Sequence, residues 1–149
     1  MSKITVVYLR TPMDGINMSS ELMRQYWREY AKQQGYANLI IYEDCCRMME
    51  SIYSRPEMKK LNEDIEQGEV ERVLVKAVNV LGRNFAETMQ WIRWVREKGV
   101  SLFFMDNNMI FRNNPENAED NANQEKILEL FYALAEAESH NKNKFMLPP

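Results

Sequence analysis

The sequence predicts an α/β fold, a three-layer sandwich in which helices cover both faces of a largely parallel central sheet of four or five strands. The first observation is that short runs of β-branched and aromatic residues alternate with longer segments whose apolar residues recur every three or four positions. The second is that the connections between these segments are short, which favours parallel strands joined by crossover helices. The third is a composition of 45% apolar residues over 149 positions, enough for one well-buried core.

The first strand and helix follow directly from this pattern. Residues 4–9, ITVVYL, suit a buried strand, because β-branched and aromatic side chains pack well on a pleated surface. After a loop, Ser19 or Ser20 is expected to cap a helix with apolar residues at i+4 spacing, and Gly35 is expected to end it. Residues 38–42, NLIIY, are expected to form the second strand.

The middle of the chain repeats this order. Pro56 suits the first turn of a second helix, since the backbone dihedral of proline is compatible with that turn, and Gly68 is a stop signal. The third strand is expected over residues 72–78, RVLVKAV. A third helix should follow Arg83 and end before Gly99, because apolar residues between these positions recur on one helical face.

The last part of the chain should contain a fourth strand over residues 100–105, an Asn-rich crossing loop and a long final helix. The apolar stripe of that helix consists of Ile127, Leu130, Phe131 and Leu134. Neither a repeat nor a stretch of linker-like composition interrupts the pattern. We therefore expect residues 1–149 to form a single domain, with no separate DNA-binding domain.

Charge and hydropathy limit the functional classes. A formal net charge of −3 and a pI near 5.3 lack the basic excess typical of free-standing nucleic-acid binders, so we expect any DNA binding to be weak or indirect. No apolar run approaches the roughly 18 residues of a membrane span, and the N-terminus lacks a signal-peptide layout. The sequence therefore predicts a cytoplasmic protein without membrane contact.

The sequence contains only two cysteines and one histidine, residue types that typically bind metals. Cys45 and Cys46 are adjacent, and neighbouring side chains of an extended segment point to opposite faces, so we expect two reduced thiols rather than a disulfide or a chelate. The single histidine, His140, lies in a polar segment near the C-terminus. We expect no cofactor and no metal.

Charged residues stand at or after the ends of three predicted strands. Arg10 and Asp44 follow the first two strands, and Arg83 follows the third. In open α/β sheets, ligands bind beyond the carboxyl ends of the strands. The three side chains are therefore expected to lie in one place, and they define a candidate site.

The order of several segments resembles the N-terminal catalytic domain of the serine recombinases, the resolvase and invertase family. The resemblance covers nearly the whole chain and is carried by VVYLR, EYAKQQGY, YED, SRPEMKKLNEDIEQGEVERVLV, LGRNFAE, KGVSLFFMD and LFYALAEAES. It implies a resolvase-like α/β domain whose long C-terminal helix supports dimerisation and DNA contact. It also implies site-specific DNA recombination, in which a serine hydroxyl attacks a DNA phosphodiester and an arginine cluster stabilises the transferring phosphoryl group.

The resemblance implies a catalytic site, and this sequence retains part of it. The strand-end arginine is Arg10, the acidic residue after the second strand is Asp44, and the arginine before the second helix is Arg55. The position of the nucleophilic serine is occupied by Pro12. The serine expected three residues after the acidic residue is replaced by Arg47.

A second part of the implied site follows the third strand. The family segment Leu-Asp-Arg-Leu-Gly-Arg corresponds here to VNVLGR, so Arg83 is retained while the Asp-Arg pair has become Asn79 and Val80. Near the final helix, the Glu-Arg step of the family is Glu138 and Ser139. The glycine and apolar positions that support the fold are kept. Arg83 is interpreted as a remnant of a phosphate-binding cluster.

These substitutions predict a domain that has lost DNA strand cleavage, because removing the attacking hydroxyl removes the covalent route. Thr11 is adjacent, but neighbouring side chains alternate in an extended segment, so its hydroxyl should point away from the place that Pro12 occupies. Ser19 and Ser20 are expected to serve as helix caps. Two alternatives stay open, an active recombinase with an altered nucleophile and a phosphate- or nucleotide-binding protein. The second would use the remaining arginines, Arg10, Arg47, Arg55 and Arg83.

The expected mode of action is binding to another protein chain. The resemblance implies a homodimer formed through the C-terminal helix, and a full-length recombinase or another mobile-element protein is a further candidate partner. Apolar residues near that helix are candidates either for such an interface or for covering the core of the domain itself. They are Met109, Ile110, Phe111, Phe145, Met146 and Leu147.

Overall fold

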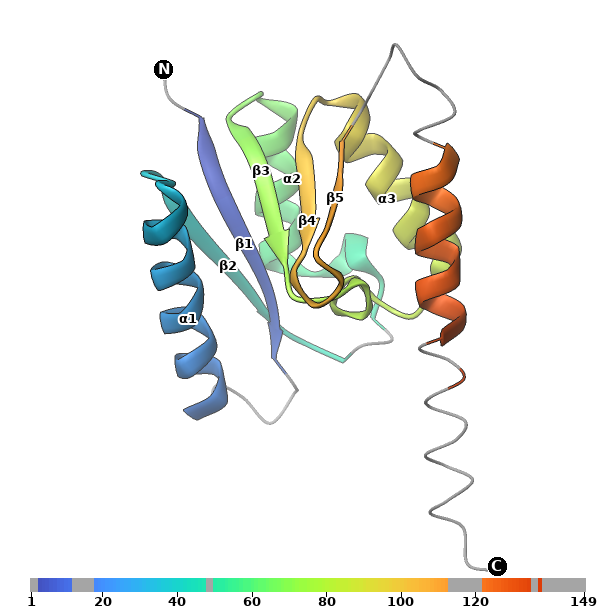
Figure 1. Ribbon diagram of the computed structural model, residues 1–149, viewed down its shortest axis with the longest axis horizontal. Coiled ribbons are helices and arrows are strands. Elements are labelled where there is room, and N and C mark those ends of the chain that lie inside the picture. The colour runs from blue at the N-terminus through green and yellow to red at the C-terminus, as the bar shows by residue number, and fades with distance from the viewer. Residues whose placement is uncertain (1–2, 12–17, 48–49, 113–121, 135–136, 138–149) are drawn as a thin grey trace, which may run out of the picture. The chain divides into compact units, whose positions relative to one another are not determined.

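The computed structural model describes residues 3–11, 18–47, 50–112, 122–134 and 137 of the chain. Two compact units make up the chain, Met1–Asn113 and Asn114–Pro149. The first unit contains all the described strands and three α-helices (Figure 1). The second contains a helix over residues 122–134.

The first unit is built on a five-stranded sheet with the strand order β2-β1-β3-β4-β5. The strands are β1 (Ile4–Thr11), β2 (Leu39–Cys45), β3 (Val70–Val75), β4 (Ser101–Phe104) and β5 (Met109–Phe111). The first four run parallel, and β5 runs antiparallel to β4. This confirms the predicted α/β fold with its largely parallel sheet.

The fifth strand lies where the sequence predicts a loop. Asn108 has a φ of 50°, in the left-handed region that asparagine tolerates, and the chain turns there to run back along β4. Phe111 is fully buried, and its ring meets that of Phe104 edge to face, with 5.3 Å between the ring centroids. Phe111 is therefore a core residue, whereas Ile110 is 46% exposed.

The α-helices of the first unit are α1 (Met18–Gln34), α2 (Pro56–Glu66) and α3 (Phe85–Glu97). α1 covers one face of the sheet, where Trp27 packs in a buried cluster with Val7, Leu9 and Leu74. α2 and α3 lie on the other face (Figure 1). Successive side chains of a strand point to opposite faces, so Val7 and Leu9 face α1 while Tyr8 faces α2. These three layers are the predicted sandwich.

Several element boundaries differ from the prediction, among them the start of α1 and the end of β3. α1 begins at Met18, so Ser19 and Ser20 lie in its first turn, and the prediction that one of them caps the helix is wrong. β3 spans Val70–Val75 instead of residues 72–78, and Val78, the last residue of the expected strand, begins a 3₁₀ helix, η2 (Val78–Leu81). Val78 and Leu81, the two ends of η2, are buried.

The helix over residues 122–134 carries the predicted stripe, whose members are Ile127, Leu130, Phe131 and Leu134. None of the helices in the described ranges is both long enough and apolar enough to cross a membrane. Several predictions fall on residues outside the described ranges. These residues are Pro12, Glu138, Ser139, His140, Phe145, Met146 and Leu147.

Candidate functional site

Arg10 and Asp44 occupy matching positions at the carboxyl ends of β1 and β2. They are register partners across the parallel pair, so both side chains point to the face that α2 covers. Arg10 Nη1 donates to the carbonyl oxygen of Cys46 at 3.0 Å. Arg10 Nε is buried and has no hydrogen-bond partner among the described residues. Arg10 therefore holds the chain where it leaves β2 and keeps one donor unused.

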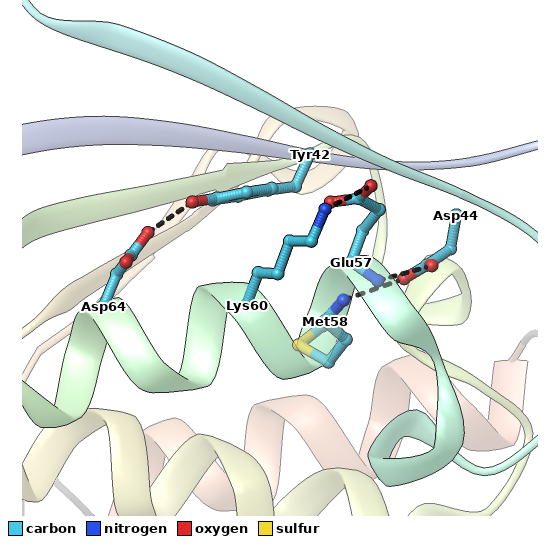
Figure 2. A network of polar contacts seen from close by, with 6 residues as sticks. All are labelled: Tyr42, Asp44, Glu57, Met58, Lys60 and Asp64. Atoms are coloured by element: carbon cyan, nitrogen blue, oxygen red, sulfur yellow. Dashed lines mark hydrogen bonds and ion pairs between the residues drawn. The ribbon is translucent and has the colours of Figure 1, made fainter.

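Asp44 binds the N-terminus of α2 (Figure 2). The residue is 3% exposed, its Oδ1 accepts from the backbone N–H of Glu57 at 2.8 Å, and its Oδ2 accepts from that of Met58 at 3.0 Å. A helix leaves four backbone donors without partners at its start, and a negative charge is favoured there. The N-cap residue, Arg55, makes no side-chain capping bond. Asp44 thus supplies the cap from the neighbouring strand.

Arg55 is fully buried. Its Nη1 donates to the carbonyl oxygen of Val80 at 2.8 Å and to the hydroxyl of Tyr8 at 3.3 Å. Its Nη2 donates to the carbonyl oxygen of Glu50 at 3.3 Å. Burying a guanidinium is costly unless it is hydrogen-bonded, and these bonds join the start of α2 to η2 and to the segment that precedes the helix. As in Arg10, the Nε of Arg55 finds no partner within the described residues.

Tyr8 connects Arg55 to Asp44. Its hydroxyl donates to Asp44 Oδ2 at 2.8 Å and accepts from Arg55. Burial raises the pKa of Tyr8 well above its ordinary value, and the hydrogen bond to Asp44 adds to this effect while Arg55 opposes it. The hydroxyl therefore stays protonated and keeps donating to the carboxylate. A continuous polar network runs from η2 through Arg55, Tyr8 and Asp44 to the backbone of α2.

A second tyrosine ties β2 to α2 (Figure 2). The Tyr42 hydroxyl donates to Asp64 Oδ2, in the last turn of the helix. Burial, together with the hydrogen bond to Asp64, raises the pKa of Tyr42 to about 12. On the same helix, Lys60 Nζ lies 3.3 Å from Glu57 Oε1. β2 therefore holds α2 near both of its ends.

Arg83 lies outside this polar network. Its side chain is exposed, and no hydrogen bond or ion pair joins it to another residue in the described ranges. Arg47 is also exposed. The structure thus brings Arg10, Asp44 and Arg55 together around the ends of β1 and β2, and it leaves Arg83 in solvent.

Thr11, which precedes the nucleophile position in the sequence, directs its hydroxyl to the face of the sheet that α1 covers. Thr11 is 6% exposed, and its Oγ1 donates to the Glu43 carboxylate. Ser20 Oγ donates to the same carboxylate oxygen at 2.6 Å, and Arg24 Nε donates to the other oxygen at 2.7 Å. Thr11 therefore points toward α1, while Arg10 points toward α2. Both hydroxyls belong to a buried cluster around one carboxylate.

The Glu43 cluster predicts a pH-dependent contribution to stability. Burial by itself raises the pKa of Glu43, but the hydrogen bonds from Ser20, Thr11 and Arg24 outweigh it, so the pKa lies below its ordinary value of 4.5. Between the lowered pKa of Glu43 in the folded protein and its ordinary pKa in the unfolded chain, the unfolded chain binds more protons than the folded one. The stabilisation is therefore complete above about pH 5 and is lost as the pH falls through the lowered pKa of the folded state.

Replacing Glu43 by Gln is expected to lower the free energy of unfolding by about 1–2 kcal/mol at neutral pH, because the charge that accepts from Arg24 and from two hydroxyls is removed. Urea unfolding of both proteins should show this difference shrinking as the pH falls from about 7 to about 3. Glu21→Gln, on the exposed side of the first turn of α1, is the control and should change little. A Glu43→Gln difference that is constant with pH would contradict the role of this charge.

The thiol of Cys46 lies near the same strand ends. It is 2% exposed, and burial raises its pKa. A protonated, buried thiol is a poor nucleophile. Within the described residues no disulfide forms, and no group of three or more His, Cys, Asp or Glu side chains could hold a metal ion.

Sequence reasoning did not identify Tyr8 and Glu43 as polar centres. Tyr8 is one of six consecutive residues that suit a buried strand, and nothing local distinguishes its hydroxyl. Glu43 did carry a signal, since two consecutive carboxylates follow the second strand. Alternation along a strand sends one to each face of the sheet, so Asp44 and Glu43 had to bind different helices.

Comparison with known sequences identifies the family. The sequence model described as Resolvase, N terminal domain matches residues 5–145 of this chain. A comparison with curated proteins finds no match. The match extends from the second residue of β1 to beyond the helix over residues 122–134, so it includes all the other described helices and strands in full.

Solved structures share the fold. The N-terminal catalytic domain of TP901-1 integrase is 18% identical with a TM-score of 0.61, covering 97% of this chain and 100% of that chain. A resolvase family site-specific recombinase from Streptococcus pneumoniae is 24% identical with a TM-score of 0.59, covering 95% and 91%. The C-terminal catalytic domain of ISC1926 TnpA, an IS607-like serine recombinase, is 20% identical with a TM-score of 0.60, covering 78% and 75%. With the family match over residues 5–145, the chain belongs to the resolvase family of serine recombinases and contains the N-terminal domain of that family.

Proposed function

We propose that this resolvase-family domain has lost DNA strand cleavage and acts by binding, as a homodimer or on another protein. The observation that carries the proposal is that the candidate replacement hydroxyls are already hydrogen-bonded to a carboxylate. Proline occupies position 12, and the hydroxyls of Thr11 and Ser20 both donate to Glu43 in a buried cluster. Cleavage through a covalent intermediate requires a hydroxyl that can reach the phosphodiester, and neither of these two meets that requirement.

The contacts of the remaining charged residues support the same proposal. Asp44 is occupied by the N-terminus of α2, and Arg55 by backbone carbonyl oxygens and Tyr8. Val80 stands where the family has an arginine, and its carbonyl oxygen accepts from Arg55. An apolar side chain there cannot stabilise charge on a transferring phosphoryl group. In this proposal Arg10, Asp44 and Arg55 maintain the fold of a former catalytic site.

Homodimerisation through the C-terminal helix remains our expected assembly. Within the helix over residues 122–134, Leu130 and Leu134 are one turn apart and are more than half exposed. Apolar side chains one turn apart form the stripe by which amphipathic helices pair. A second copy of the chain, a full-length recombinase or another mobile-element protein could occupy that stripe. We also expect the protein to act in the cytoplasm.

A covalent-trapping experiment tests the loss of cleavage. Purified protein is incubated with supercoiled DNA, the reaction is quenched with detergent, and protein–DNA adducts are sought on a gel. We expect no adduct from the natural sequence. Pro12→Ser should give a slow adduct, since it restores the hydroxyl but leaves Val80 uncharged, a loss worth roughly 10²–10³-fold in rate. Pro12→Ser combined with Val80→Arg should react faster. An adduct formed by the natural protein would overturn the proposal.

A second candidate function is phosphate binding without cleavage. One observation favours it, because the Nε donors of Arg10 and Arg55 are buried and unused within the described residues, while Arg83 is exposed. The same DNA samples distinguish the two candidates when retention is measured without detergent. DNA retention that falls steeply with salt and weakens in Arg83→Ala would support phosphate binding. No DNA retention at any salt concentration would support the protein-binding proposal.

A further inference from the structure

A groove with a cationic wall runs along the β2 edge of the sheet. α1 and β2 form it, and it encloses about 490 Å³. Its wall carries Arg24, Arg28 and Lys32, and its floor includes Leu39 and Ile41. The whole chain has a formal net charge of −3, so a row of three cations beside an apolar floor is a local exception.

The floor of the groove is an unpaired strand edge. β2 is the outermost strand and pairs with β1 alone among the described strands. The N–H of Thr5 donates to the carbonyl oxygen of Asn38 at 2.9 Å, so Asn38 and every second residue after it turn their backbone groups toward β1. Alternate residues of a parallel strand direct their backbone groups to opposite sides. The N–H and C=O groups of Leu39, Ile41 and Glu43 therefore point away from β1, toward the side where a further strand could pair.

The cations repeat at the spacing of a β-strand. Arg24, Arg28 and Lys32 are four residues apart, so at 1.5 Å per residue they follow one another by about 6 Å along α1. Every second side chain of an extended peptide is separated by about 6.6 Å. Arg24 is paired with Glu43, but the side chains of Arg28 and Lys32 are exposed and make no ion pair with any residue that the structure describes. Figure 1 shows α1 running alongside the sheet at this edge.

We propose that this groove binds an extended segment of a partner protein whose acidic side chains occupy alternate positions. The segment adds to the sheet beside β2, with its backbone paired to the outward groups of Leu39 and Ile41 and its carboxylates facing Arg28 and Lys32. A nucleic-acid backbone offers phosphates but no complement to a strand edge, so a peptide fits the floor better. The groove lies along the sheet edge and not at the strand ends. The inference therefore goes beyond the proposed function and is independent of whether DNA is cleaved.

A synthetic peptide tests the geometry of the groove. The probe is a fluorescein-labelled ten-residue peptide in which glutamate alternates with valine and threonine, titrated with the full chain and followed by fluorescence anisotropy. It should bind at least about tenfold more tightly than a peptide of the same composition with its glutamates in one block, and than one with lysine in place of glutamate. N-methylation of every second amide, on the side that faces β2, should abolish binding, because it removes the strand-edge hydrogen bonds.

Two protein variants locate the binding. Arg28→Glu with Lys32→Glu should weaken binding of the alternating peptide at least about tenfold, since two attractive contacts become repulsive. The charge-matched control is Lys59→Glu with Lys60→Glu, at two exposed positions of α2 on the other face of the sheet, and it should bind as the natural sequence does. Circular dichroism confirms that each variant is folded. The proposal is overturned if the blocked or lysine peptide binds equally well, if the groove variant binds normally, or if single-stranded DNA displaces the peptide more effectively than unlabelled peptide does.

Discussion

Replacing Arg55 with methionine is expected to lower the free energy of unfolding by about 3–5 kcal/mol. Methionine keeps an unbranched apolar stem but lacks the guanidinium, so it leaves the carbonyl oxygens of Val80 and Glu50 without their donor. Asp44 would also stay buried without the positive charge that reaches it through the Tyr8 hydroxyl. Removing one partner of a buried polar network is costly because the remaining groups cannot be hydrated.

The measurement is urea unfolding followed by tryptophan fluorescence, with the buried Trp27 and Trp91 as probes. Arg83→Met is the matched control, because it deletes the same chemical group from an exposed side chain and should change stability by less than about 0.5 kcal/mol. Equal, small effects of both substitutions would mean that Arg55 is not needed for the fold. Arg55 would then be available to bind phosphate, as the second candidate function requires.

Replacing Asp44 with alanine should lower the free energy of unfolding by about 2–4 kcal/mol. The substitution leaves the backbone N–H groups of Glu57 and Met58 without an acceptor at the buried start of α2. It also removes the acceptor of the Tyr8 hydroxyl, which is itself buried. Asp44→Asn should fall between the natural protein and the alanine variant, because the amide oxygen can still accept one of these bonds.

Amide hydrogen exchange would show whether the effect of Asp44→Ala begins at the helix start. The amides of Glu57 and Met58 should lose protection before those near the end of α2. Asp106→Ala is the control, since the Asp106 carboxylate accepts from Lys76 at 2.9 Å in an exposed ion pair and should contribute less than about 1 kcal/mol. Unchanged protection of Glu57 and Met58 in the alanine variant would contradict the assignment of Asp44 as the cap of α2.

Together these two predictions distinguish a structural role from a chemical one. A phosphate-binding arginine is held ready for a ligand, and its removal usually alters binding more than stability. Arg55 instead has two carbonyl oxygens and a tyrosine hydroxyl as partners and is fully buried. A domain that has lost its nucleophile would still need this residue to fold. Within our proposal, this explains why the sequence keeps Arg55 and Asp44 although the nucleophile position is a proline.

The elements were predictable wherever a local pattern was long enough. The alternation of strand and helix, the glycines after α1, α2 and α3, and Pro56 at the start of α2 all depend on periodicity or on single-residue backbone preferences. β5 was missed because a three-residue strand has almost no pattern of its own. It forms because Asn108 permits the turn and because Phe111 packs against Phe104. Such a short strand forms because it pairs with a neighbouring strand, here β4, and not because of its own sequence pattern.

By itself, the sequence determined the family, the fold class and the edge of the sheet where Arg10 and Asp44 lie. These follow from motifs, from periodicity and from the rule that parallel strands end at one edge. Only the tertiary structure decided what the residues at that edge bind. Tyr8 meets Asp44 across 36 positions and Arg55 across 47, and Thr11 meets Glu43 across 32. Hydrogen bonds act over about 3 Å, so partners this distant in sequence are chosen by the fold, and local residue types cannot reveal them.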